Sequence, residues 1–165
     1  RRLVNDLRPP MLDAFGLLGA IRQLVPAESD IAFDLRAPEP MPALPAAVEV
    51  AAYRIAGEAI HNVIRHSGAR RCLLRIALAA DELGLEVSDD GRGFPADLPV
   101  GVGTSSMRER AAELGGSLML ENELDGGARV LARLPLRLAP AGLEPPGLDP
   151  PGLEPVEHQQ PNQES

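Results

Sequence analysis

Apolar residues follow two periodicities along the chain, and together these predict an α/β fold. Apolar positions spaced by three and four predict helices at about 12–25, about 46–66 and 105–114. Short apolar runs and apolar–polar alternation predict strands at 31–36, 72–79, 83–88, 117–124 and 128–136. The first eight residues are expected to be the last turns of a helix that begins before this sequence.

Glycines and prolines mark the expected ends of these elements. Pro9-Pro10 should end or kink the first helix, since proline has no amide hydrogen to donate. Four prolines between residues 37 and 45 indicate a connector, and Ser67-Gly68 is a plausible stop for the central helix. Asp125-Gly126-Gly127 predicts the turn of a hairpin formed by the last two strands.

The central helix carries two stripes of different character. Glu58, Asn62 and His66 recur at spacings of four, so a carboxylate, an amide and an imidazole project side by side. Carboxylate and amide oxygens are ligands that Mg²⁺ accepts together with water and phosphate oxygens. A solvated helix face is the plainer alternative, and His61 lies off this row. The apolar stripe consists of Val48, Ala51, Ala52, Ile55, Ala59 and Val63.

Two glycine-containing turns follow the central helix. Asp89 ends an apolar strand, where a carboxylate can accept a hydrogen bond from an exocyclic amine such as that of adenine. Gly91 and Gly93 allow close backbone approach or positive φ. Gly101 and Gly103 precede a helix, whose N-terminal amides suit phosphate oxygens. Each turn alone is common, but their order and spacing after the polar stripe make the combination specific.

Composition narrows the classes of function. The 165 residues allow one domain of ordinary size, and the net charge of −8 does not suggest a nucleic-acid partner. Every basic residue is arginine, which excludes a P-loop because that motif needs its lysine. The single cysteine, Cys72, fits a core position and a reducing compartment. No apolar run is long enough to span a bilayer.

The last part of the chain differs in composition from the rest. From Pro140 it repeats Gly-Leu-Glu-Pro-Pro with small variations and ends in polar residues. Such a segment buries too little apolar surface to offset its ordering entropy, so residues 139–165 are expected to be a disordered acidic tail. Because the chain starts with arginine, we expect it to be a fragment of a longer protein. The expected location of the fragment is cytoplasmic, and the parent protein could be membrane-anchored.

The chain resembles the GHKL ATPases, and specifically the catalytic half of bacterial two-component sensor histidine kinases. Residues 107–116 and 7–12 are similar to the subclass that pairs with LuxR-type response regulators. The resemblance covers residues 1 to about 136. The matching motif positions are Glu58 and Asn62 of the N-box, Asp89, Gly91 and Gly93 of the first glycine box, and Gly101 and Gly103 of the second.

This resemblance implies an architecture and a reaction. The fold would be a two-layer α/β sandwich, with a mixed, mostly antiparallel sheet covered on one face by helices. Residues 1–27 would end a dimerisation hairpin, and residues 28–138 would bind ATP. Asn62 would ligate Mg²⁺, Glu58 would hold a water near the γ-phosphate, Asp89 would select adenine, and His66 is a candidate phosphate contact.

The resemblance also implies partners and leaves alternatives open. A histidine outside this chain would accept the phosphoryl group and pass it to the receiver domain of a LuxR-type regulator. The parent protein would form a homodimer through the upstream hairpin. Ala128 replaces a frequent threonine, and Thr104 stands where an aliphatic residue is common. Another GHKL ATPase, an anti-sigma-type kinase and a degenerate nucleotide-binding module are the competing interpretations.

Overall fold

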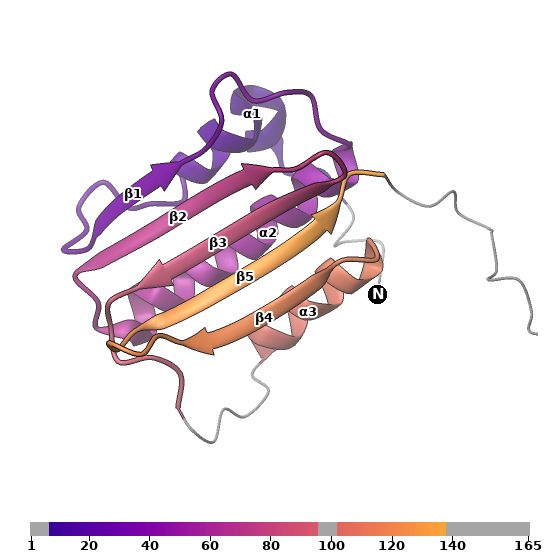
Figure 1. Cartoon of the computed structure of the whole chain (residues 1–165). Helices are drawn as coiled ribbons and strands as arrows, with labels where there is room; N and C mark the ends of the chain where they lie inside the picture. The colour runs from indigo at the N-terminus through magenta and orange to yellow at the C-terminus, as the bar shows by residue number, and fades with distance from the viewer. Residues whose placement is uncertain (1–6, 96–101, 138–165) are drawn as a thin grey trace, which may run out of the picture.

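A computed structural model describes residues 7–95 and 102–137 and shows one five-stranded sheet with helices on a single face (Figure 1). The sheet order is β1-β2-β3-β5-β4. The strands are β1 (Ala32–Arg36), β2 (Arg71–Leu78), β3 (Glu82–Asp89), β4 (Ser117–Asn122) and β5 (Ala128–Pro135). The helices are α1 (Pro10–Arg22), α2 (Ala46–Asn62) and α3 (Val102–Glu113), and a π-helical turn, η1 (Val63–Ser67), continues α2.

The sheet is mixed and mostly antiparallel, as predicted. β1 runs parallel to β2, while the β2–β3, β3–β5 and β4–β5 pairs are antiparallel. Because β5 lies between β3 and β4, the last hairpin places the end of β3 beside the start of β5. Ser88 pairs with Arg129 in this register. The ends of β3 and the final hairpin therefore meet at one edge of the molecule.

Helix α2 packs against the sheet through the predicted apolar stripe. Its small residues, among them Ala52, Ala56 and Ala59, are buried and allow a close approach to the strands. On the facing strand, Leu83, Leu85 and Val87 alternate with more exposed positions, as expected for a sheet covered on one side. Burying a side chain of this size contributes roughly 1.5–3 kcal/mol. This contact fixes the polar stripe of α2 relative to the end of β3.

Helix α1 belongs to the same core, but its buried face differs from a simple helical stripe. Leu12, Leu17 and Ile21 are buried, whereas Phe15 is 55% exposed. Gly16 has φ +65° and interrupts the helical geometry, so the residues on either side do not continue one face. The assignment of residues 1–27 to a dimerisation hairpin stays a prediction, and residues 1–6 and 139–165 lie outside the described part.

The other face of the sheet carries charged pairs. Glu86 on β3 binds Arg75 at 2.9 Å and Arg129 at 2.9 Å, and Arg129 also lies 3.6 Å from Glu121. Such pairs suit a face that water reaches, and each contributes little to stability. Cys72 points to the covered face, where burial raises the pKa of its thiol to about 12. Within residues 7–95 and 102–137, no helix has the length and apolarity to cross a membrane.

Candidate nucleotide site

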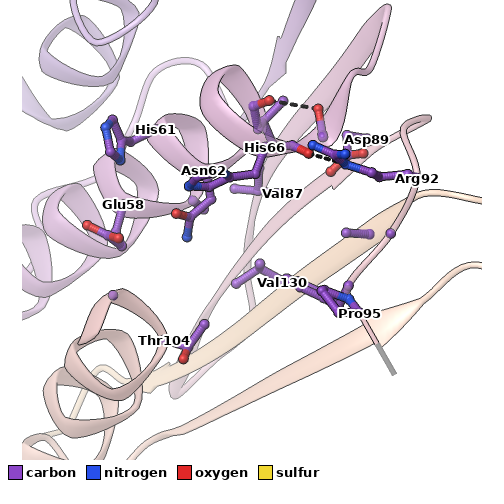
Figure 2. A pocket seen from close by; sticks show the side chains of 17 residues that line it. Glu58, His61, Asn62, His66, Val87, Asp89, Arg92, Pro95, Thr104 and Val130 are labelled. Carbon is purple, nitrogen blue, oxygen red and sulfur yellow. Dashed lines mark hydrogen bonds between the residues drawn. The ribbon is translucent and has the colours of Figure 1, made fainter. Parts of the chain in front are cut away.

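A cavity of about 850 Å³ opens between α2, α3 and the ends of β3 and β5 (Figure 2). Figure 2 shows Glu58, Asn62 and His66 along one wall and Thr104 across from them, with Asp89 and Arg92 beyond His66. The structure thus brings the polar stripe and the end of β3 to one space. The lining residues are Glu58, Ala59, His61, Asn62, Val63, His66, Ser67, Val87, Asp89, Arg92, Gly93, Phe94, Pro95, Gly103, Thr104, Ala128 and Val130.

The α2 wall combines an α-helix with a wider last turn. Glu58 and Asn62 are half-buried on the α-helix, while His66 is exposed on η1. The expectation of a regular α-helix to residue 66 is therefore wrong for its last turn. The Ser67 hydroxyl donates to the Val63 carbonyl oxygen at 2.7 Å, and its oxygen accepts the Ala69 amide at 2.9 Å. Wide turns of this kind are frequent at functional sites.

The helix ends where the sequence predicted. Gly68 adopts a left-handed conformation with φ +63°, which side-chain-bearing residues rarely adopt. The chain then turns directly into β2. Ser67 and Gly68 together therefore end the α2 wall of the cavity shortly before β2 begins.

Asp89 lies at the far end of the cavity, at the last position of β3. Asp89 is buried, with 8% of its surface exposed. Its Oδ1 accepts a hydrogen bond from the Gly91 amide at 2.8 Å. Burial raises the pKa of the Asp89 carboxyl, while hydrogen bonds from the amides of Gly91 and Ala128 oppose that change. A buried carboxylate with remaining acceptor capacity suits a ligand that presents an N–H donor.

The glycines of the first turn are required by close contacts. A Cβ on Gly91 would overlap the Ser67 carbonyl oxygen, so the turn approaches the end of α2 with no room for a side chain. Gly93 has φ +77° and faces the Asn122 amide. The close approach at Gly91 and the positive φ at Gly93 are the two properties for which glycine was expected at these positions. They fix the turn between β3 and the neighbouring elements.

The second glycine pair is only partly described. Gly101 lies outside the described residues, whereas Gly103 lines the cavity in the first turn of α3. A Cβ on Gly103 would overlap the Glu58 carboxylate. Gly103 therefore lies directly against the Glu58 side chain, and a larger residue there would displace that carboxylate. A role for this pair in binding phosphate stays a prediction.

Several lining residues were not identified from the sequence as site residues. His61 lines the cavity although it lies off the row of spacing four. Arg92 also lines the cavity. Its place between Gly91 and Gly93 in the first glycine turn was the sequence feature that could have identified it as a site residue. Thr104 and Ala128, noted as departures from the family pattern, both line the cavity and are buried.

The donor set fits magnesium held jointly with a ligand. The described residues contain no group of three or more His, Cys, Asp or Glu side chains arranged to hold a metal by themselves. Asn62 and Glu58 present an amide and a carboxylate at the cavity. Mg²⁺ usually takes one or two protein ligands and completes its shell with phosphate oxygens and water. This cavity therefore offers the protein's share of such a site.

Comparison with known proteins gives consistent results. Residues 47–138 match the family model described as histidine kinase-, DNA gyrase B- and HSP90-like ATPase. The chain is 37% identical over 93 residues to the sensor histidine kinase LnrJ of Bacillus subtilis, covering 56% of this chain and 23% of that protein. It is 34% identical over 143 residues to the sensor histidine kinase MctS of Rhizobium johnstonii, covering 82% and 31%.

Solved structures show the same architecture. The ATP-binding domain of PrrB from Mycobacterium tuberculosis superposes with a TM-score of 0.55 at 26% identity, covering 75% of this chain and 94% of that domain. The histidine kinase domain of a blue-light activated kinase from Erythrobacter litoralis has a TM-score of 0.60 at 20% identity, covering 73% and 57%, and supports the fold alone. The chain spans well under half the length of the curated relatives it matches. The chain therefore belongs to the family of histidine kinase-, DNA gyrase B- and HSP90-like ATPases, and its similarity is to the ATP-binding catalytic domains of sensor histidine kinases.

Proposed function

We propose that this chain is the ATP-binding catalytic domain of a sensor histidine kinase. It would bind Mg·ATP and transfer the γ-phosphoryl group to a histidine outside this chain, for relay to an aspartate of a response regulator. The observation that carries the proposal is the single cavity joining Asn62 on α2 with Asp89 at the end of β3. A nucleotide needs a metal side and a base side within one space, and Asn62 and Asp89 would supply them in this cavity.

The base side is built from Asp89 and an apolar surface. Val87, Ala128 and Val130 line the cavity beside the carboxylate and are buried, so a flat base would lie against aliphatic carbon. The Asp89 carboxylate would accept a hydrogen bond from the N6 amine of adenine. Guanine presents a carbonyl oxygen at that place, which a carboxylate repels. Adenine selection therefore follows from one buried acceptor.

The phosphate side is built from the polar stripe of α2. Asn62 would ligate Mg²⁺, Glu58 would hold a water near the γ-phosphate, and His66 would contact phosphate oxygens. Bound magnesium supplies positive charge that neutralises the phosphates, and positioning with charge neutralisation provides most of the catalysis in phosphoryl transfer. Gly103 places the first turn of α3 against this side. Amides at a helix N-terminus favour anions there.

Partners follow from the resemblance of residues 7–12 and 107–116 to one subclass of sensor kinases. The proposed recipient is the receiver domain of a LuxR-type response regulator. The parent protein is proposed to be a homodimer joined by a helical hairpin that carries the phosphoacceptor histidine. Residues 28–138 would then act as a cytoplasmic catalytic unit that delivers ATP to the hairpin.

Calorimetric titration of this chain with ATP, with and without Mg²⁺, tests the proposal. We expect saturable binding that Mg²⁺ strengthens, and GTP under the same conditions should bind more weakly. Equal binding with and without Mg²⁺ would favour a nucleotide-binding module without catalysis. Absence of binding to ATP and ADP would overturn the proposal. Phosphorylation of a histidine in the full-length parent protein, measured with labelled ATP, then tests the transfer step.

A further inference from the structure

The turn that follows β3 is bonded to the end of α2 through Arg92. The Arg92 side-chain Nε donates to the His66 carbonyl oxygen at 2.6 Å, and its backbone amide donates to the Ser67 carbonyl oxygen at 2.9 Å. Figure 2 shows the Arg92 side chain reaching from the turn to the helix end beside His66. Two consecutive carbonyl groups of η1 are therefore held by a single residue from another element.

These two carbonyl groups need partners from elsewhere because the helix stops. The last carbonyl oxygens of a helix have no amide one turn further on to accept from. Gly68 turns the chain into the left-handed region, and β2 begins three residues later at Arg71. Arg92 supplies a donor to each of these two carbonyl groups. The carbonyl groups at the end of the π-helical turn thus accept their hydrogen bonds from the turn that follows β3.

A continuous set of contacts links the two ends of the cavity. Asp89 Oδ1 accepts the Gly91 amide, and Gly91 lies against the Ser67 carbonyl with no space for a side chain. Arg92 then binds the carbonyl groups of Ser67 and His66. His66 lies on η1, four residues after Asn62 at the end of α2, so the turn that follows Asp89 is attached to the segment directly after Asn62.

We propose that Arg92 is a positioning residue, which holds η1 so that His66 and Asn62 face the phosphates while Asp89 holds the base. This inference rests on the proposed function and assigns a further residue to that site. Arg92 acts through its Nε–H bond to the His66 carbonyl oxygen. Its charge is not the property that matters for nucleotide affinity.

Two substitutions separate the donor from the charge. Arg92→Gln keeps an N–H donor at the atom attached to Cδ, where arginine has Nε, and removes the charge. Arg92→Lys keeps the charge but places a methylene at that atom. Arg92 is exposed, so neither change disturbs the core. Circular dichroism and urea unfolding of both variants check that the fold is kept.

The first measurement is calorimetric titration with Mg·ADP. We expect Arg92→Gln to bind within about twofold of the parent chain, and Arg92→Lys to bind about tenfold more weakly, as the loss of one hydrogen bond predicts. The opposite order would show that the charge acts directly on phosphates and would overturn the proposal. Equal affinities in the two variants, whether reduced or unchanged, would overturn it as well.

The second measurement needs no nucleotide. Amide hydrogen exchange across residues 62–67 of the free protein should be faster in Arg92→Lys than in the parent and unchanged in Arg92→Gln. If the parent chain fails to bind Mg·ADP, the proposed function fails while the exchange difference still tests the bond from Arg92 to η1. Equal exchange in the parent and both variants would show that Arg92 does not hold this turn.

Discussion

Asp89 and Asp90 are adjacent carboxylates whose environments move their pKa values in opposite directions. Burial raises the pKa of Asp89 at the inner end of the cavity. Asp90 points outward, where its Oδ1 accepts the amides of Arg71 and Arg70 at 2.8 Å each, and these bonds lower its pKa. One strand end thus places a buried carboxylate at the cavity beside an outward carboxylate that is bonded to the backbone of Arg70 and Arg71.

Replacing Asp89 should weaken nucleotide discrimination without a large cost to folding. Asp89→Asn presents an amide that no longer acts as a pure acceptor, so the preference for ATP over GTP should fall. The measurement is the ratio of the two dissociation constants in the parent and the variant. An unchanged ratio would contradict the assignment of Asp89 to the base.

The same variant has a defined pH signature. A carboxyl whose folded-state pKa is raised contributes stability that is present below its unfolded pKa and is lost as pH rises through the folded pKa. The free energy of unfolding of the parent should therefore decline relative to Asp89→Asn across that interval. Urea unfolding over an acidic to neutral pH series measures it. A relative gain by the parent with rising pH would contradict the burial argument.

Asp90 should give the reverse dependence. Its lowered pKa means that its stabilisation is present above the unfolded pKa and is lost as pH falls through the folded pKa. Asp90→Ala should thus be less stable than the parent at neutral pH, and the difference should shrink in acid. The same urea series decides this. A difference that stays constant with pH would show that the carboxylate charge is not what stabilises the turn.

Asn62→Ala should remove the magnesium dependence of nucleotide binding while the fold is kept. The side chain is half-buried at the cavity and does not belong to the apolar core. We expect Mg·ATP affinity to fall by about tenfold or more, equivalent to about 1.4 kcal/mol. Titration with ATP, with and without Mg²⁺, measures the effect. Gln23→Ala, which removes an exposed amide after α1, is the matched control and should behave as the parent.

Asn122 should stabilise the turn at Phe94, which lines the cavity. Its Oδ1 accepts the Phe94 amide at 2.7 Å, and its Nδ2 donates to the Phe94 carbonyl oxygen at 3.0 Å. Asn122→Ala should lower the free energy of unfolding by about 1–3 kcal/mol, since it removes two bonds that contribute roughly 0.5–1.5 kcal/mol each. Leu124→Ala on the same hairpin is the control, because Leu124 is fully exposed. Equal stability in the two variants would contradict this role.

The local elements were largely predictable because they depend on short-range periodicity. The stripe containing Val48, Ile55 and Ala59 is buried on α2, and the five expected strands are all present. The hairpin turn at Gly126 and Gly127 also has the positive φ angles that its glycines predict. In each case the residues that interact are close together in the sequence, so their spacing alone predicts the helix, strand or turn.

The departures arise where distant residues meet. The kink at Gly16 exposes Phe15, although its spacing fits a helix, because backbone geometry and packing decide which face is buried. The π-helical turn at the end of α2 was not predicted from its own residues, and two of its carbonyl groups accept bonds from Arg92 in another element. His61, which lies off the row of spacing four, also lines the cavity.

The sequence by itself determined the alternating elements, the polar row of α2 and the two glycine turns, because each depends on residue types at fixed local spacing. Only the tertiary structure decided that Asn62 and Asp89 open into one cavity. That meeting requires β5 to lie beside β3 and α2 to pack across both, and packing between segments far apart in the chain is not encoded in any single local pattern.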